Sequence, residues 1–382
     1  MAESVKVIDP NTGSGYDYDS LFDWEAAQQA DIDTSNTIAV AKCRCTGGTA
    51  DTTAVVIDGW TTSATDYIKI WTDTSESYRH SGKWETGNKY RLSLAKTDGA
   101  LVSVYEPYTR VIGIQTNNTG TYGSAFGIEL VVGSSGSIID SCIFYQGIEG
   151  IFVDSESYIV NCIAVDCSTT GFDFTPSGAC FAYNCTAIDC GYGFLCSYGS
   201  ATIKNCLGHS NTTADFFYEG SGTFTVTYCA SSDLTADDRG GAGNRISRAF
   251  TFVDEAGNDF HLASNDAGAL GFGLNLYNDA TYPFQTDIDG DDRGGAAASW
   301  DIGADESVSA TSIEQEGFRF RNDDGSETTA TWKANQDTNI TAPKNVNTRL
   351  RFVVNSTGDF SATQFQLEYR KSGESTWRKV TI

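Results

Sequence analysis

The sequence has little of several things that would place it in a familiar functional class. Only 25 of its 382 residues are Lys or Arg, against 50 Asp and Glu, and it has 3 His and 5 Pro. Because phosphate contacts need Lys and Arg, a net charge of −25 argues against nucleic acid and anionic membranes as partners. No apolar run reaches the roughly 18 residues of a membrane-spanning helix, so we expect no membrane insertion.

Targeting and catalytic motifs are missing as well. The N-terminal stretch lacks the basic start and apolar core of a signal peptide, so we expect a protein made and kept in the cytosol. No GxSxG elbow is present, which disfavours a nucleophilic triad. Cys43 and Cys45 form a CxC pair, but there is no CxxC motif and no His-rich partner, which disfavours a zinc site. We therefore predict no cofactor.

Cysteine, in contrast, is abundant and partly periodic. Cys142, Cys162, Cys185, Cys206 and Cys229 recur at intervals of 20, 23, 21 and 23 residues. Short segments of Ile, Val, Phe, Tyr and Thr accompany them, and such residues favour strands. A period of this length indicates a solenoid in which each repeat forms one coil. Leucine-rich repeats have a similar period, but their consensus leucines are absent, so we predict an all-β parallel β-helix.

The same cysteines are not expected to form disulfides. Their total of 11 is odd. Stacked coils lie about 4.8 Å apart, and the Cβ vectors of stacked residues run parallel, whereas a disulfide needs them to face one another. We expect mostly buried free thiols that act as small hydrophobes.

Three regions follow from the pattern. Residues 1–36 form an N-terminal cap with a helix at 16–32, because Ser20 can cap it, Asp23 follows three residues later, and Leu21 and Trp24 share one face. Residues 37–312 form the β-helix, with roughly a dozen coils of about 22 residues. Residues 313–382 contain five alternating strand candidates and predict a small β-sandwich of the immunoglobulin or fibronectin type III kind.

Charge separates the last region from the others. Residues 313–382 hold 10 Lys and Arg and 9 Asp and Glu, which leaves 15 basic and 41 acidic residues for the first 312. The alternating arginines of its strands are expected to point outward as a docking surface for an acidic partner, although a solvated face is the more frequent explanation of such a pattern. These residues are Arg319, Arg321, Arg349 and Arg351.

Two sets of side chains are candidates for glycan chemistry. The five periodic cysteines are here called the cysteine ladder, and Asp166 and Asp189 each follow one of them by four residues. Stacking would bring their carboxylates near the roughly 5 Å spacing of a retaining glycosidase, although aspartate is also common in turns. Tyr183, Tyr192 and Phe194 could line a sugar-binding groove, although such aromatics more often fill the solenoid.

Asp287, Asp289 and Asp291 resemble the start of a calcium loop. The match fails further on, because Asp292 stands where an EF-hand needs glycine and Ala298 where it needs glutamate. We therefore predict no metal here. Instead we expect the segment to fold over the open end of the solenoid, with Arg293 paired to Asp301 or Glu306.

Three segments carry a family resemblance. DYDSLFDWEAAQQADI with TIAVAKC and DGWTTSATDYIKIWT resembles the opening of right-handed parallel β-helix proteins of tailed bacteriophages and prophages. DIDGDDRGG with DIGADE resembles the closing motif of bacterial and phage β-helix proteins, and EGFRFRNDDGSETTATW with TRLRFVVNSTGD and FQLEYRK resembles a C-terminal module of phage structural proteins. The resemblance implies a virion component assembled in the host cytoplasm.

Three functions remain open at this stage. The first is a non-enzymatic virion rod on the capsid or tail, as a decoration, fibre or spike, with other virion proteins as partners and a homo-oligomeric state such as a trimer. The second is a tailspike-type depolymerase, a glycoside hydrolase that cleaves bacterial surface polysaccharide. The third is a rod that binds such a polysaccharide without turnover.

Overall fold

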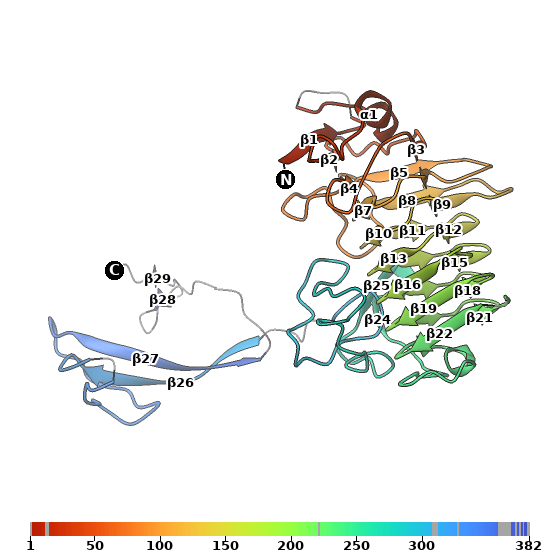
Figure 1. The fold of residues 1–382 in the computed structure, drawn as a ribbon. Helices are drawn as coiled ribbons and strands as arrows, with labels where there is room; N and C mark the ends of the chain where they lie inside the picture. Colours follow the sequence, from red (N-terminus) through yellow and green to blue (C-terminus); the bar gives the residue numbers. More distant parts are fainter. Residues whose placement is uncertain are drawn as a thin grey trace. The chain divides into compact units, whose positions relative to one another are not determined.

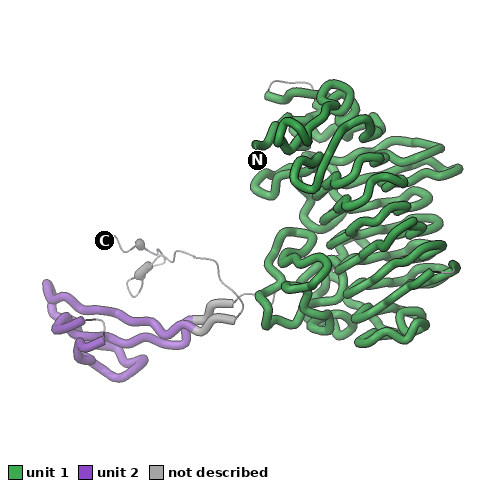
Figure 2. Tube along the Cα trace, viewed as in Figure 1, with its two compact units in different colours: residues 1–307 green, residues 308–382 purple. Residues whose placement is uncertain are grey.

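The protein is described by a computed structural model (Figure 1), which covers residues 2–11, 15–220, 222–307, 312–326 and 328–357, together with 368–370, 373, 376 and 378–379. The chain divides into two compact units, residues 1–307 and residues 308–382 (Figure 2). Unit 1 contains a solenoid of short strands, and unit 2 contains a long antiparallel hairpin.

Unit 1 is a parallel β-helix with three sheets, each built from one strand per coil (Figure 1). Sheet 1 has nine strands: β1 (Ala2–Ile8), β2 (Thr37–Cys43), β4 (Ile68–Trp71), β7 (Arg110–Ile112), β10 (Ser137–Asp140), β13 (Ser157–Val160), β16 (Ala179–Tyr183), β19 (Ser200–Lys204) and β22 (Thr223–Thr227). Sheet 2 has seven: β5 (Arg91–Leu94), β8 (Gln115–Asn118), β11 (Ile143–Tyr145), β14 (Ile163–Val165), β17 (Thr186–Ile188), β20 (Leu207–His209) and β23 (Ala230–Ser231). Sheet 3 has seven: β3 (Val55–Ile57), β6 (Val102–Val104), β9 (Phe126–Leu130), β12 (Glu149–Val153), β15 (Thr170–Phe174), β18 (Tyr192–Cys196) and β21 (Ala214–Tyr218).

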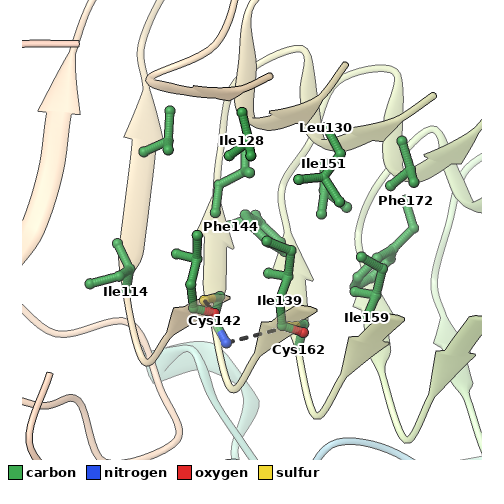
Figure 3. Packing of buried hydrophobic residues seen from close by; sticks show 14 of the residues in the cluster. Ile114, Ile128, Leu130, Ile139, Cys142, Phe144, Ile151, Ile159, Cys162 and Phe172 are labelled. Carbon is green, nitrogen blue, oxygen red and sulfur yellow. Dashed lines mark hydrogen bonds between the residues drawn. The ribbon is translucent and has the colours of Figure 1, made fainter. Parts of the chain in front are cut away.

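The core of the solenoid consists of like residues stacked along its axis. Parallel strands in register bring equivalent side chains into line, because alternate residues of each strand face the same side. Ile139 pairs with Ile159, and Figure 3 shows the two side chains pointing into the same interior. On sheet 3, Phe172, Phe194 and Phe216 form a second stack, with ring centroids 4.8 and 4.9 Å apart.

The cysteine ladder lines this interior. All eleven cysteines are buried and free, so the prediction of buried free thiols is confirmed. The sulfurs also have a polar role that the sequence did not indicate. The backbone N–H of Cys142 donates to Sγ of Cys162 at 3.4 Å (Figure 3), and Cys185 and Cys206 donate in the same way to Sγ of Cys206 and Cys229, both at 3.3 Å. The ladder therefore also satisfies backbone donors at the coil corners.

A left-handed residue precedes each ladder cysteine and turns the chain from sheet 1 into sheet 2. The φ angles at these corners lie between 50° and 54°: Ser141, Asn161, Asn184, Asn205 and Tyr228. Asparagine tolerates this conformation better than most residues, which explains why it recurs before the cysteines. Burial raises the pKa of the Cys162 and Cys206 thiols, so both remain protonated and unreactive.

A short helix covers the N-terminal end of the solenoid. The predicted helix is present but shorter than expected, as α1 (Leu21–Gln28). Ser20 accepts a hydrogen bond from the N–H of Asp23 at 3.1 Å, which is the predicted cap. Leu21 and Trp24 are buried, and the Trp24 ring stacks on Trp60 with centroids 5.5 Å apart. The helix thus closes the apolar interior at this end.

The chain does not continue the coils beyond β23. Residues 233–307, here called the return segment, first cross the last coil through η1 (Thr235–Asp237), whose Ala236 joins the interior core. They then fold back along the outside of sheets 2 and 1 and carry β24 (Phe252–Asp254), η2 (Glu255–Gly257) and β25 (Asp259–Leu262). Phe260 and Ile302 pack there against outward residues of sheet 2 such as Ile163. The expectation of roughly a dozen coils over residues 37–312 is therefore wrong, because the apolar residues of this segment cover a flank.

Unit 2 contains small antiparallel sheets. β26 (Ser312–Asn322) pairs with β27 (Thr348–Thr357), and β28 (Glu368–Tyr369) pairs with β29 (Arg378–Lys379). Antiparallel strands agree with the alternating pattern of the sequence. Most of the predicted strands FQLEYRK and WRKVTI lies outside the described residues, and the immunoglobulin-like sandwich stays a prediction.

Candidate functional site

The predicted carboxylate pair lies at a recurring corner of the solenoid. Val165 pairs with Ile188, so Asp166 and Asp189 occupy equivalent places on neighbouring coils, and both are exposed. Their φ angles are 57° and 53°. Partial burial, and then the charge of Asp166, raises the pKa of Asp189. A left-handed turn accounts for both aspartates without catalysis, and their catalytic role stays a prediction.

Two of the three predicted sugar-binding aromatics are covered. Phe194 is fully buried between the rings of its interior stack, and Tyr183 lies under Leu276 and Trp300 of the return segment. Neither ring offers a face to a ligand, so the prediction is wrong for these two residues. Tyr192 is half-buried on the outer side of sheet 3 and stacks on Phe217 with centroids 5.1 Å apart.

The predicted docking arginines are largely engaged within unit 2. They form cross-strand pairs in the hairpin: Arg319 with Arg351, and Arg321 with Arg349. Arg319 and Arg321 lie 4.1 and 4.5 Å from the ring centroid of Trp332. Arg321 is buried and donates to the carbonyl of Ala330, so it does not point outward as expected. Arg351 is exposed.

The calcium-like segment is a backbone turn capped by its first aspartate. Oδ1 of Asp287 accepts hydrogen bonds from the N–H groups of Asp289, Gly290 and Asp291 at 2.9 to 3.0 Å. Asp291 is exposed, whereas Asp289 turns toward His261. The three predicted carboxylates therefore do not share one site.

The predicted ion pair of Arg293 with Glu306 is present, at 3.1 Å. Its place differs from the prediction. Arg293 is fully buried and also donates to Oδ1 of Asn161 at 3.1 Å, a corner residue between β13 and β14. The motif therefore anchors the return segment to the flank of the solenoid, and does not close the open end.

A cluster of ionisable side chains lies where the return segment meets residues 75–87, a loop between β4 and β5 that is here called the insertion. It is here called the flank cluster and comprises Lys83, Asp259, His261, Asp289 and Asp305. His261 bonds through Nδ1 to Oδ1 of Asp259 and through Nε2 to Oδ2 of Asp289, the latter at 2.9 Å. Lys83 pairs with Asp259 at 2.7 Å. One ligand atom each from His261, Asp289 and Asp305 lies within 4.8 Å of the other two.

Burial and charge act strongly in the flank cluster. Burial raises the pKa of Asp305 to about 7, although its Oδ2 accepts a hydrogen bond from the N–H of Leu262 at 2.7 Å. Burial opposes protonation of His261, but the hydrogen bond and charge of Asp289 and the nearby carboxylates raise its pKa to about 10. Oδ1 of Asp289 is buried and has no hydrogen-bond partner.

A second acidic group lies on the outer face of sheet 3. Glu149 pairs with Phe126 on one side and Thr170 on the other, and Asp173 pairs with Phe152. The rings of Phe126 and Phe152 stack with centroids 5.0 Å apart, which places an apolar wall beside both carboxyl groups.

This apolar setting disfavours the ionised carboxylates. Burial, and then the charge of Asp173, raises the pKa of Glu149 to about 8, and its Oε2 has no hydrogen-bond partner. Burial raises the pKa of Asp173 to about 6, against a hydrogen bond from Ser197 at 3.3 Å. The turn before β12 also lines a hollow of about 440 Å³ that includes Gln146 and Ser168.

Neither acidic group was found in the sequence analysis. The flank cluster joins residues more than 200 positions apart, and only the fold of the return segment brings them together. The sequence did contain a signal for the pair of Glu149 and Asp173. Asp173 stands between Phe172 and Phe174 in β15, so it must face outward when they face the interior.

Comparison with known proteins agrees with the solenoid. Residues 114–233 match the family model described as right handed beta helix region, which covers the most regular coils. No curated protein matches the chain. No solved structure matches it either. Among the described residues, no helix is both long and apolar enough to cross a bilayer. Unit 1 therefore contains a right-handed parallel β-helix.

Proposed function

We propose that the protein is a non-enzymatic structural component of a tailed-phage particle, in which unit 1 is a stiff spacer and unit 2 attaches to the capsid or tail. The observation that carries this proposal is the continuity of the core. A single buried cluster runs from Ile8 in the first strand to Cys229 beside the last one. A stack without a break resists bending, because each coil packs on both neighbours.

The surface chemistry supports the same role. Positions 1–312 hold all of the excess acidic charge, which keeps a stack of coils soluble and unaggregated. The first, closing and C-terminal segments resemble phage proteins, and this resemblance is why we propose a phage particle as the assembly. Assembly in a reducing host cytoplasm suits eleven thiols that are buried and unpaired.

The test is the composition of purified particles. Phage particles from cells that produce this chain are purified through a density gradient and quantified by mass spectrometry against a major capsid protein. The proposal expects the chain at a fixed copy number that survives high-salt washing. Absence of the chain from particles, or its loss in the wash, would overturn the proposal.

A glycoside hydrolase is the second candidate, favoured by one specific observation. Glu149 has a pKa raised to about 8, as a general acid requires near neutral pH, and Asp173 is a nearby carboxylate. Glu149 on β12 pairs with Thr170 on the neighbouring strand β15. Asp173 lies three residues beyond Thr170, so it is displaced from Glu149 by one strand sideways and by about 10 Å along the strand. This offset favours the wider, inverting arrangement of carboxyl groups over the retaining one.

The hydrolase candidate has its own experiment. Purified full-length chain is incubated with capsule and lipopolysaccharide from a panel of bacterial hosts, and new reducing ends are measured. Glu149→Gln and Asp173→Asn should each abolish release, whereas Asp166→Asn, at the exposed corner, should not. NMR of the first product should show inverted anomeric configuration. Equal release by wild type and Glu149→Gln would exclude this site.

A further inference from the structure

We propose that His261, Asp289 and Asp305 bind one divalent transition-metal ion, Mn²⁺ or Zn²⁺, which joins three parts of the return segment to one another. The three side chains already present one ligand atom each within 4.8 Å of one another. A metal with ligand bonds of about 2.0 to 2.2 Å holds its donors within that span.

The donors fit this class of ion. One imidazole nitrogen with two carboxylates suits a borderline metal, whereas Ca²⁺ takes six to eight oxygen ligands. Asp259 supplies the outer support that metal-bound histidines usually have, because its carboxylate accepts from Nδ1 of His261. That bond orients the ring and leaves Nε2 directed at Asp289.

Two further observations support a ligand at this place. Oδ1 of Asp289 is buried and has no hydrogen-bond partner, which is costly for a carboxylate oxygen. The loop of residues 75–87 also approaches the same donor atoms closely. A Cβ on Gly82 would lie 2.3 Å from both Oδ1 of Asp289 and Nε2 of His261, so any side chain there would crowd the two donors.

Charge points the same way. Asp259, Asp289 and Asp305 bring three carboxyl groups together, and Lys83 is the cation that pairs with Asp259, at 2.7 Å. A divalent ion that takes the place of the proton on Nε2 of His261 would keep a positive charge beside Asp289 and Asp305. Because the ligands come from β25, the turn at 287–290 and residue 305, the ion would join parts of the return segment beneath the insertion.

The experiment uses the full chain, stripped of metal with a chelator and then dialysed. Mn²⁺ and Zn²⁺ are titrated separately by calorimetry, and Co²⁺ is used for visible absorption. We expect one saturable site per chain. His261→Gln and Asp289→Asn should weaken binding at least tenfold, and the Co²⁺ spectrum should change in His261→Gln. Asp291→Asn, an exposed neighbour in the same turn, is the matched control and should bind like the wild type.

Circular dichroism and thermal unfolding of each variant show whether it is folded. Bound metal should raise the unfolding temperature of the wild type and of Asp291→Asn, and should leave that of folded Asp289→Asn unchanged. The absence of a saturable site in the wild type would overturn the proposal. Equal affinity in the folded wild type, His261→Gln and Asp289→Asn would do so as well, because the ion would then lie elsewhere and the flank cluster would be an ion-pair network only.

Discussion

At the scale of single residues, the ladder cysteines combine packing with hydrogen bonding. Their sulfurs fill the interior at the corner of each coil, and those of Cys162, Cys206 and Cys229 accept a hydrogen bond from a backbone N–H of the preceding coil. A purely apolar side chain could provide the packing but would leave that donor without a partner. This explains why a small residue with an acceptor atom recurs at the same place.

The ladder predicts a difference between two substitutions of similar size. Cys206→Ala removes the acceptor for the N–H of Cys185 and should cost about 1 to 3 kcal/mol in the free energy of unfolding. Cys206→Ser retains an acceptor atom and should cost less. Urea denaturation followed by circular dichroism measures both. Equal losses would mean that the sulfur acts through packing alone.

Glu149 predicts a pH dependence of stability. Its pKa is about 8 in the folded chain, whereas an unfolded glutamate titrates near 4.3. Between about pH 4 and pH 8 the unfolded state therefore loses its proton first, so the free energy of unfolding falls as pH rises and levels off above pH 8. Asp173, at about 6, acts in the same direction over a narrower range.

Glu149→Gln should flatten this profile and stabilise the protein at pH 8 by about 2 kcal/mol, since one pKa unit corresponds to about 1.4 kcal/mol and partial exposure weakens the effect. Denaturant unfolding at several pH values between 5 and 9 provides the measurement. The exposed Glu156→Gln on the same coil is the control and should leave the profile unchanged. A variant profile parallel to that of the wild type would show that Glu149 is not the group responsible.

At the scale of elements, α1 acts as the plug of the solenoid. Trp24 is 1% exposed and stacks on Trp60, whereas Phe22 of the same helix is 49% exposed. Trp24→Ala should therefore cost about 3 to 5 kcal/mol, and Phe22→Ala less than about 0.5 kcal/mol. Thermal or urea unfolding of the two variants compares them directly. Similar small losses would mean that the helix is not part of the core.

The return segment illustrates what the sequence could and could not predict. The coils were predictable, because each one places a cysteine at the same corner and the period survives as a spacing of 20 to 23 residues. The return segment has no such period. Its partners, such as Ile163 and Leu207, lie on the outside of sheet 2, and an apolar residue on an outer face does not reveal what covers it.

Site residues were predicted unevenly for the same reason. Arg293 with Glu306 could be predicted, because the partners lie close in sequence. Phe194 was predicted to line a groove but is buried in the interior, because the sequence of a strand does not show which of its aromatic residues face inward. His261 and Asp289 meet only after the chain has reversed along the flank, which no local pattern encodes.

At the scale of the whole molecule, we propose separate roles for the two units, a stiff spacer for unit 1 and attachment for unit 2. Unit 1 buries a continuous core of its own, so residues 1–307 should fold without unit 2. Unit 2 would then supply attachment. The division gives each unit a separate readout: unfolding of the solenoid for unit 1, and incorporation into particles for unit 2.

The most direct test of this account is the incorporation of a truncated chain. Residues 1–307 and the full chain are each supplied to cells that assemble the particle without its own copy, and gradient-purified particles are quantified by mass spectrometry. Circular dichroism and the urea midpoint establish that the truncated chain is folded. The account predicts a folded chain of unchanged midpoint that is absent from particles, while the full chain is present. Truncated chain in particles at the level of the full chain would contradict it.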